Sequence, residues 1–177
     1  MHPIIDVESA ELRLWQQQCL QLVDIQSERQ VIWIKGMRGN EGKSWLQSYV
    51  QSMYGFARTV RLDFKGKVND IYLALSKRPL TTTDIFMFND GRASSEDAKP
   101  CYSVLEAIKD DTAINGMYHS EEVRFKTPNV VIVFSDVNQD VMQLSQDRWQ
   151  ILSITKDGLK RQDRRLAERK ICKFILC

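Results

Sequence analysis

The sequence predicts an α/β fold in which a parallel sheet is covered by helices on both faces. Short apolar runs typical of buried strands alternate with segments of helical periodicity. A glycine-rich turn separates the first of these strands from the helix that follows it. Of the 177 residues, 43% are hydrophobic and 27% are charged, a mixture that suits one globular domain with an ordinary core.

The individual elements follow from the residue pattern in chain order. Apolar residues at helical spacing predict a helix within residues 7–28, with Ser9 as a candidate cap. Residues 113–126 contain Asn115-Gly116 and mixed charges, which predict a hairpin or a projecting loop. We expect strands at 31–34, 58–64, 84–88, 129–135 and 149–154, and further helices at 43–54, 68–77 and 96–110.

The composition argues against several classes of protein. No stretch reaches the ~18 apolar residues that a membrane span needs. Acidic residues at positions 6, 8 and 11 stand where a signal peptide would have a basic start and an apolar run. The four cysteines include no CxxC pair, so we expect reduced thiols in an intracellular protein, not a zinc site or a disulfide framework.

Positive charge is concentrated at the end of the sequence. Residues 155–177 hold eight basic and three acidic residues, a net charge of +5 in a chain whose total is +2. A basic segment on a mildly acidic body favours an anionic partner, with nucleic acid as the first candidate. A solvated amphipathic helix is the alternative, and charge alone favours this alternative.

The most specific local motif is the glycine-rich turn between the first strand and the next helix. Backbone N–H groups in such a turn converge on phosphate oxygens, and the helix N-terminus adds partial positive charge. Lys43 would reach the β- and γ-phosphates, and the Ser44 hydroxyl would bind Mg²⁺. The strict spacing G-x-x-x-x-G-K-[ST] needs glycine at Met37, so this loop is one residue longer. The predicted nucleotide-binding residues are Gly36, Met37, Arg38, Gly39, Asn40, Glu41, Gly42, Lys43 and Ser44.

Polar residues end two other predicted strands. Asn89 and Asp90 follow the strand at 84–88, where a carboxylate that holds Mg²⁺ and orients water is needed for hydrolysis. A turn at Asn-Asp-Gly is the alternative. The strand at 129–135 leads into Asp136, with Asn138 two residues on, and a polar side chain there can contact the γ-phosphate or its attacking water. A helix cap at Asp136 is equally compatible with the sequence.

Taken in order, these pieces resemble the superfamily 3 helicase domain of replication initiator (Rep) proteins from circular single-stranded DNA viruses, above all the nanovirus and alphasatellite type. The loop GMRGNEGKS resembles that group's extended Walker A pattern, G-P-x-G-x-E-G-K-[ST]. FNDGR at 88–92 is similar to its Walker B stretch, and VVIVFSD to its motif C. In LSQDRWQI at 144–151, Arg148 matches the family's arginine finger. The resemblance runs from Val31 to Ile154.

The resemblance implies a P-loop NTPase of the AAA+-like, superfamily 3 class. Its fold would be a three-layer αβα sandwich around a parallel five-stranded sheet of order 5-1-4-3-2. The implied division is a helical oligomerisation segment at 1–29, a helicase and ATPase domain at 30–155 and a basic C-terminal helix or tail at 156–177. The implied cofactors are ATP and Mg²⁺.

The implied activity is ATP-dependent DNA unwinding or translocation during rolling-circle replication. The implied partners are single-stranded DNA and further copies of the chain in a hexameric ring, without a membrane, in the host nucleus. Full-length members begin with a nicking domain, which uses two histidines separated by one residue and a tyrosine. His2 and His119 are far apart, so we expect the nicking domain outside this chain, on its N-terminal side.

The resemblance also assigns roles to single residues. The catalytic set comprises Lys43, Asn89, Asp90, Asp136 and Arg148. Ser44 and Asp90 would hold the metal, because the family usually has aspartate where Asn89 stands. Motif C usually ends in asparagine where this chain has Asp136. The expected DNA contacts are Lys109, Arg124 and Lys126, for which exposed loop charge is the alternative.

Two other functions fit the same sequence. The departures at Asn89 and Asp136 are also compatible with a nucleotide-binding module that assembles on DNA but hydrolyses slowly or not at all. A P-loop kinase or NTPase acting on a small molecule is the second alternative, and it requires neither DNA nor neighbouring subunits.

Overall fold

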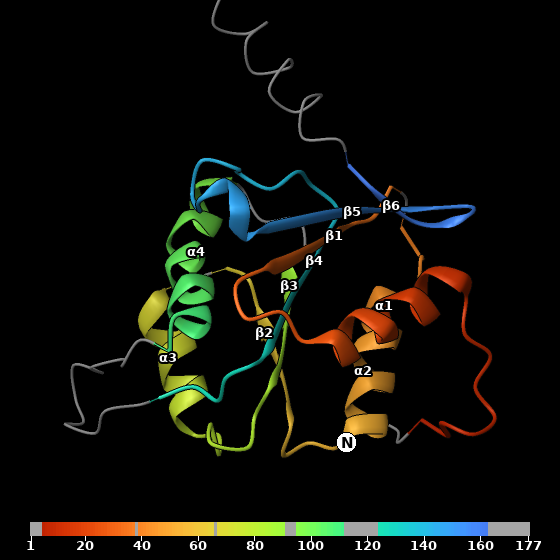
Figure 1. The fold of residues 1–177 in the computed structure, drawn as a ribbon, viewed down its shortest axis with the longest axis horizontal. Helices are drawn as coiled ribbons and strands as arrows, with labels where there is room; N and C mark the ends of the chain where they lie inside the picture. The colour runs from red at the N-terminus through yellow and green to blue at the C-terminus, as the bar shows by residue number, and fades with distance from the viewer. Residues whose placement is uncertain (1–4, 38, 66, 91–94, 112–123, 163–177) are drawn as a thin grey trace, which may run out of the picture.

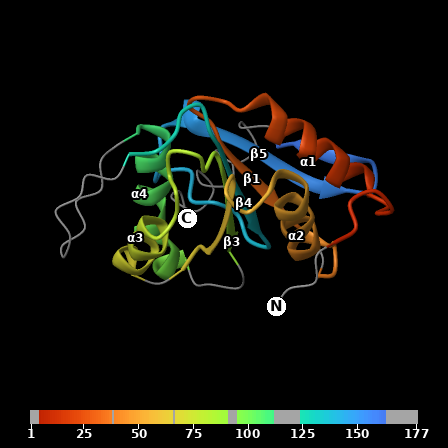
Figure 2. The same ribbon diagram turned by 90° about the horizontal axis from the view of Figure 1, so that it is seen from below.

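The structure, a computed structural model, describes residues 5–37, 39–65, 67–90, 95–111 and 124–162. Figure 1 shows three layers, with the sheet between one pair of helices, α1 and α2, and another pair, α3 and α4. Figure 2 shows the same layers from below, with α1 running alongside β5. The helices are α1 (Leu14–Ile25), α2 (Lys43–Tyr54), α3 (Val68–Ser76), α4 (Ser95–Lys109) and the short 3₁₀ helix η1 (Gln146–Arg148). The strands are β1 (Val31–Lys35), β2 (Thr59–Asp63), β3 (Ile85–Asp90), β4 (Val130–Ser135), β5 (Trp149–Thr155) and β6 (Gly158–Arg161).

The sheet has six strands in the order β2-β3-β4-β1-β5-β6. Strands β1 to β5 are parallel and, counted from β5, follow the order 5-1-4-3-2. The sixth strand, β6, is antiparallel to β5 and corrects the expectation of a sheet with five strands. It lies inside the predicted tail at 156–177, of which residues 163–177 are outside the described part of the chain.

The β5–β6 hairpin has a local cause. Gly158 has φ = 99°, a left-handed conformation that glycine adopts without strain. The Thr155 hydroxyl donates to the Gly158 carbonyl (2.8 Å) and accepts from the Asp157 amide (3.2 Å), which closes the turn. The Asp-Gly pair is therefore a hairpin signal that the charge of the surrounding segment obscured.

Alternating strand residues divide the core into two apolar layers. In β1, Ile32 and Ile34 pack with α1 and α2, whereas Val31 and Trp33 pack in the layer of α3 and α4. All four are buried. Because both faces of the parallel sheet are covered, its strands are apolar on both sides, which explains the continuous apolar runs in the sequence.

The first helix is shorter than the predicted 7–28 and begins at Leu14. The Ser9 hydroxyl does not cap it but donates to the Asp6 carboxylate (2.6 Å). At the helix start, the Arg13 amide donates to the Gln16 side chain (2.9 Å). The apolar side of α1, which includes Trp15 and Cys19, belongs to the same core layer as α2.

Within the described ranges, no helix has the length and apolar character needed to cross a membrane. The same ranges hold no group of three or more histidine, cysteine, aspartate or glutamate residues placed to bind a metal ion. Cys19 and Cys101 are buried free thiols.

Candidate nucleotide-binding site

The glycine-rich loop runs from the end of β1 to the start of α2. At its beginning, the Gly36 amide donates to the Ser135 carbonyl at the end of β4 (2.7 Å). At its end, Asn40 (φ = 67°) and Gly42 (φ = 85°) take the left-handed conformation that turns the chain into the helix. The loop therefore directs the first turn of α2 towards the carboxyl ends of the strands.

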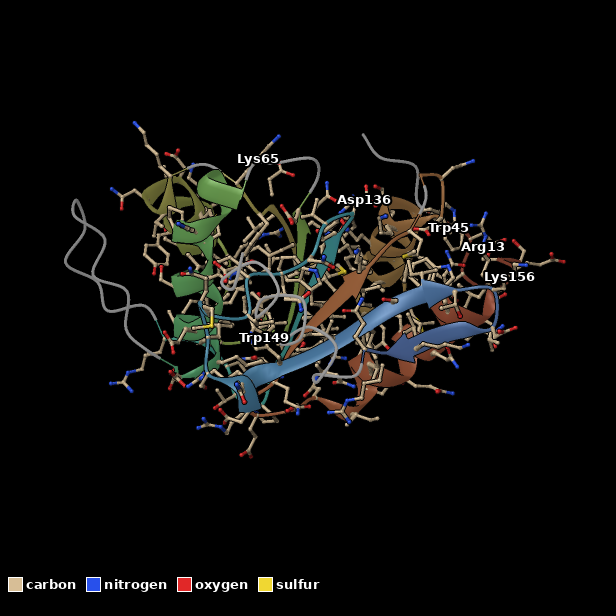
Figure 3. The ribbon with its side chains drawn as sticks, turned by 90° about the horizontal axis from the view of Figure 1, so that it is seen from above. Arg13, Trp45, Lys65, Asp136, Trp149 and Lys156 are labelled. Atoms are coloured by element: carbon tan, nitrogen blue, oxygen red, sulfur yellow. The ribbon has the colours of Figure 1, made fainter. Side chains whose placement is uncertain are left out.

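Two side chains of the first helix hold this loop from outside. The Arg13 guanidinium donates to the carbonyls of Asn40 (3.3 Å) and Glu41 (2.9 Å). The Gln16 amide donates to the Gly42 carbonyl (3.4 Å). In the view of Figure 3, Arg13 and Trp45 of α2 lie on the same side of the molecule. Sequence reasoning missed Arg13, because its contacts span 27 and 28 residues and no local pattern marks them.

The centre of the loop holds a small charged cluster, formed by Glu41, Lys43 and Asp136. The Lys43 ammonium pairs with the Glu41 carboxylate (3.2 Å) and closely with Asp136. The second Glu41 oxygen accepts from the Met37 amide (2.9 Å). A carboxylate of the chain itself thus occupies a position where a backbone N–H and an ammonium converge, which is the donor set of an anion site.

Gly36 leaves the space in which this cluster forms. A Cβ at position 36 would overlap the Glu41 carboxylate and the Lys43 ammonium, and would press on Asp136. With glycine at 36, one residue earlier than the strict spacing, the three charged side chains meet without having to shift. Arg38, predicted to belong to the loop, lies outside the described residues, and Gly39 and Ser44 are exposed.

The strand register decides which polar residues face the loop. Asn89 pairs with Phe134, which belongs to the core layer of α1 and α2, and so its side chain is on the α2 face. Asp136, two residues after Phe134, reaches Lys43 on the same face. Asp90 pairs with Ser135 on the opposite face, the one covered by α3 and α4.

Asp90 is buried on that opposite face, 2% exposed. Burial raises the pKa of its carboxyl group, a hydrogen bond from the Ser135 hydroxyl lowers it (2.7 Å), and the charge of Asp136 raises it. The other carboxylate oxygen, Oδ1, has no hydrogen-bond partner among the described residues. The expected magnesium ligand is therefore not on the α2 face, where Lys43 lies, and Asn89 takes that face instead.

A cavity of about 190 Å³ opens beside Asn89. Its lining consists of Gln47, Arg61, Leu62, Asp63 and Asn89. The Arg61 guanidinium donates to the Gln47 side-chain oxygen (3.0 Å) and the Ser48 hydroxyl (2.8 Å), which fixes the strand against α2. Sequence reasoning missed Arg61 and Asp63, although their alternate positions in an apolar strand were a signal that both share one face.

Arg148 and Lys109 lie at the other end of the sheet from the loop. Trp149, next to Arg148, pairs with Val31 at the start of β1. Arg148 is 7% exposed and donates to both oxygens of Asp110 (2.6 and 2.9 Å). In this chain it is a buried ion-pair residue and is not presented as an arginine finger.

Lys109 is 5% exposed, which corrects the prediction that it contacts DNA. Its ammonium donates to the carbonyls of Ser27 (2.6 Å) and Asn129 (2.7 Å), and so joins α4 to the segments before β1 and β4. Burial, together with the charge of Arg148, lowers the pKa of Lys109 to about 7.

The other two predicted DNA contacts have partners within the chain. Lys126 donates to Asp84 (2.8 Å), and Arg124 lies 4.0 Å from Asp111. The predicted hairpin at 113–126 falls mostly on residues 112–123, outside the described part of the chain.

Comparison with known proteins identifies relatives of one kind. No family model matches the chain. Para-Rep C7 of the Faba bean necrotic yellows C7 alphasatellite is 32% identical over 145 residues, 81% of this chain and 48% of that protein. Para-Rep C10 of the Milk vetch dwarf C10 alphasatellite is 31% identical over 144 residues, 80% of this chain and 48% of that protein. Para-Rep C6 of the Subterranean clover stunt C6 alphasatellite is 30% identical over 144 residues, 80% of this chain and 47% of that protein.

The chain spans about half the length of the curated relatives that it matches. The match covers about four fifths of the chain, which is too much for the loop motif alone to account for. The chain is therefore a homologue of the alphasatellite Para-Rep proteins, in agreement with its resemblance to the Rep proteins of circular single-stranded DNA viruses.

Proposed function

We propose that the chain is the ATP-hydrolysing domain of a replication protein and drives a DNA helicase. The observation that carries the proposal is the anion site at the start of α2, where the Met37 amide and the Lys43 ammonium converge on a carboxylate of the chain itself. A β- or γ-phosphate group presents the same acceptor oxygens to these donors. The relatives support a role in replication, because each is named a Para-Rep protein.

In the proposed mechanism, nucleotide binding displaces the Glu41 carboxylate from the loop. The backbone amides and Lys43 then bind the β- and γ-phosphates, and Ser44 lies at the helix N-terminus where P-loop proteins hold Mg²⁺. A bound Mg²⁺ supplies neutralisation of the phosphate charge. Asp136, released from Lys43, accepts a hydrogen bond from the attacking water. That water forms the new bond to the γ-phosphorus as its proton passes to Asp136, the bond to the bridging oxygen breaks, and ADP leaves with inorganic phosphate as the second product.

The wider role is also part of the proposal. By resemblance, the domain would act in a hexameric ring on single-stranded DNA in the host nucleus. The placement of Arg148 does not support its use in a neighbour's site, because the Asp110 ion pair would first have to open. Ring assembly therefore has to be tested directly, by measuring mass in solution with and without nucleotide and single-stranded DNA.

A second candidate function is a nucleotide-binding module with little hydrolysis. The amide of Asn89 favours it, because this side chain takes the α2 face where the resembling family has a carboxylate. The burial of Asp90 on the opposite face favours it as well. Both candidate functions require ATP binding at the loop, and only the first requires ATP hydrolysis.

The test combines nucleotide binding with steady-state hydrolysis at about 1 mM Mg²⁺-ATP, in the usual range of enzyme assays. The variants are Lys43→Ala and, as a matched control, Lys67→Ala, an exposed lysine that precedes α3. We expect the wild type to bind ATP and Lys43→Ala to lose about 10- to 100-fold in affinity, as the loss of a charge-assisted hydrogen bond implies. Hydrolysis that rises with single-stranded DNA supports the motor.

Binding without turnover supports the second candidate. Equal ATP affinity in the wild type and in Lys43→Ala would rule out both candidates, because each places the phosphates on this loop. A comparable loss in Lys67→Ala would show that the effect is one of surface charge, not of the site.

A further inference from the structure

We propose that Arg13 and Gln16, at the start of α1, are positioning residues for the nucleotide. They bind the carbonyl side of the glycine-rich loop and thereby direct the amides on its other side towards the phosphates. This role rests on the proposed nucleotide-binding function, and it belongs to two residues that lie outside the loop and its motif. Both act through the loop backbone, not through contact with the nucleotide.

The two side chains bind three consecutive carbonyls of the loop. One terminal nitrogen of Arg13, Nη1, carries two N–H groups and donates to the carbonyls of Asn40 (3.3 Å) and Glu41 (2.9 Å). The Gln16 side-chain amide donates to the next carbonyl along the chain, that of Gly42 (3.4 Å). These three carbonyls therefore point towards the start of α1.

The geometry of the peptide bond converts these contacts into a direction for the loop amides. In a trans peptide unit, the C=O of one residue and the N–H of the next point in opposite directions. The three bound carbonyls thus direct the amides of Glu41, Gly42 and Lys43 away from α1. Within the described part of the chain, the amides of Gly42 and Lys43 have no acceptor, which suits them to phosphate oxygens.

The bonds to the carbonyls also strengthen the amides as donors. A hydrogen bond accepted by the oxygen of a peptide polarises that peptide, and the effect is larger when the donor is a charged guanidinium such as that of Arg13. The Gly42 carbonyl accepts, in addition, the first hydrogen bond of α2, from the Leu46 amide (2.9 Å). Gln16 therefore acts at the residue where the loop becomes the helix.

Arg13 and Gln16 can restrain the loop because α1 is itself fixed. Trp15 is buried in the core layer that α1 shares with α2. The Gln18 side chain accepts from the Leu159 amide in β6 (2.6 Å), which ties the helix to the edge of the sheet. Gln16 is 2% exposed, and its side-chain oxygen accepts from the Arg13 amide (2.9 Å), so its orientation is set. A side chain held in this way positions a backbone more precisely than one on a loop.

The experiment measures the affinity for a fluorescent ATP analogue at about 0.1 M and about 1 M salt, between which the screening length falls from about 10 Å to about 3 Å. We expect Arg13→Ala to bind about 5- to 30-fold more weakly than the wild type at both concentrations, the equivalent of ordering the backbone of one loop residue on binding. Arg13→Lys, which keeps several N–H donors on a long side chain, should recover part of the loss.

The matched control is Arg29→Ala, which should bind ATP as the wild type does. Arg29 is an exposed arginine before β1, at the other end of the sheet, where it pairs with Asp147 (2.7 Å). Gln16→Met tests the second side chain, and we expect a smaller loss, up to about fivefold, because the Gly42 carbonyl keeps its bond from Leu46. Thermal unfolding verifies that each variant is folded.

Three results would overturn the inference alone. They are equal affinity in Arg13→Ala and the wild type, a loss that disappears at about 1 M salt and so reflects long-range charge, and an Arg13→Lys variant that recovers nothing. Each is read in a protein whose ATP binding is still weakened by Lys43→Ala, so the proposed function survives them. A wild type that binds no ATP overturns the proposed function and the inference with it.

Discussion

Acidic and basic residues lie at both ends of the parallel strands, but those of the loop cluster at the carboxyl ends are partly exposed, whereas the basic residues Arg148 and Lys109 at the amino ends are buried. At the carboxyl ends, Glu41, Lys43 and Asp136 meet across loops, and Asp63 faces a cavity. At the amino ends, Arg148 and Lys109 are buried and bonded to fixed acceptors. The first group can exchange its partners for a ligand, whereas the second closes gaps between elements. Position relative to the strands, and not residue type, therefore separates the proposed binding residues from the structural ones.

A chain of ion pairs makes the amino ends a structural unit. Arg58 precedes β2, Asp84 precedes β3 and Lys126 comes shortly before β4. Asp84 accepts from both basic residues, at 3.0 and 3.1 Å from Arg58 and 2.8 Å from Lys126. These ion pairs join the amino ends of β2, β3 and β4 to one another. The polar groups of the proposed site lie at the opposite, carboxyl ends of the strands.

The largest effect on stability is expected from Arg148→Met. The substitution leaves Asp110 without its bidentate partner, but Asp110 is 39% exposed and can be hydrated, so we expect a loss of about 2–3 kcal/mol in the free energy of unfolding. Urea unfolding measures it. Nucleotide affinity should not change, since Arg148 lies at the amino ends. A stable variant that loses hydrolysis only in the assembled state would instead restore the arginine-finger role and break the comparison.

A smaller effect is expected from Asp84→Asn, at about 1–2 kcal/mol, because both basic partners are partly exposed. Burial raises the pKa of Asp84, but the hydrogen bonds and charges of Arg58 and Lys126 outweigh it, and the net pKa is lowered. With a folded pKa below the unfolded value, the contribution is fully present above the unfolded pKa near 3.8 and is lost as pH falls through the folded pKa.

The check on Asp84 is a series of urea unfolding curves between pH 7 and pH 3. The stability of the wild type should fall more steeply than that of Asp84→Asn towards acid, with Asp70→Asn, which changes an exposed aspartate in the first turn of α3, following the wild type. Parallel curves for all three proteins would contradict the structural role given to the amino ends.

The smallest effect, and one of opposite sign, is expected from Glu41→Gln. Removing the charge weakens the contact that competes with phosphate for Lys43 and the Met37 amide, so ATP affinity should rise by up to about tenfold. Stability should change little, since the cluster lies in a loop. Fluorescence titration with an ATP analogue gives the affinity. A fall in affinity would mean that Glu41 contributes to ATP binding. It would contradict the idea that the charged residues at the carboxyl ends exchange their partners for a ligand.

The sequence predicted most of the fold because its signals are local. The apolar runs became β1 to β5, and the predicted helices at 43–54, 68–77 and 96–110 appear as α2, α3 and α4 with small shifts of their ends. The sequence analysis missed β6, because its Asp-Gly turn lies in a segment that was predicted to be a basic tail. It also missed the start of α1. Arg13 and Lys109 were missed or misassigned because their bonds join residues at least 20 positions apart.

The sequence by itself determined the glycine-rich loop, because the residues from Gly36 to Ser44 are contiguous and lie between an apolar strand and a helix. The tertiary structure alone decided between Asn89 and Asp90. The strand before them, Ile-Phe-Met-Phe, is buried on both faces and so has no polar alternation to indicate which side α2 covers. That side is set by pairing with β2 and β4, and the same pairing brings Asp63 to the α2 face, where no motif had placed an acid.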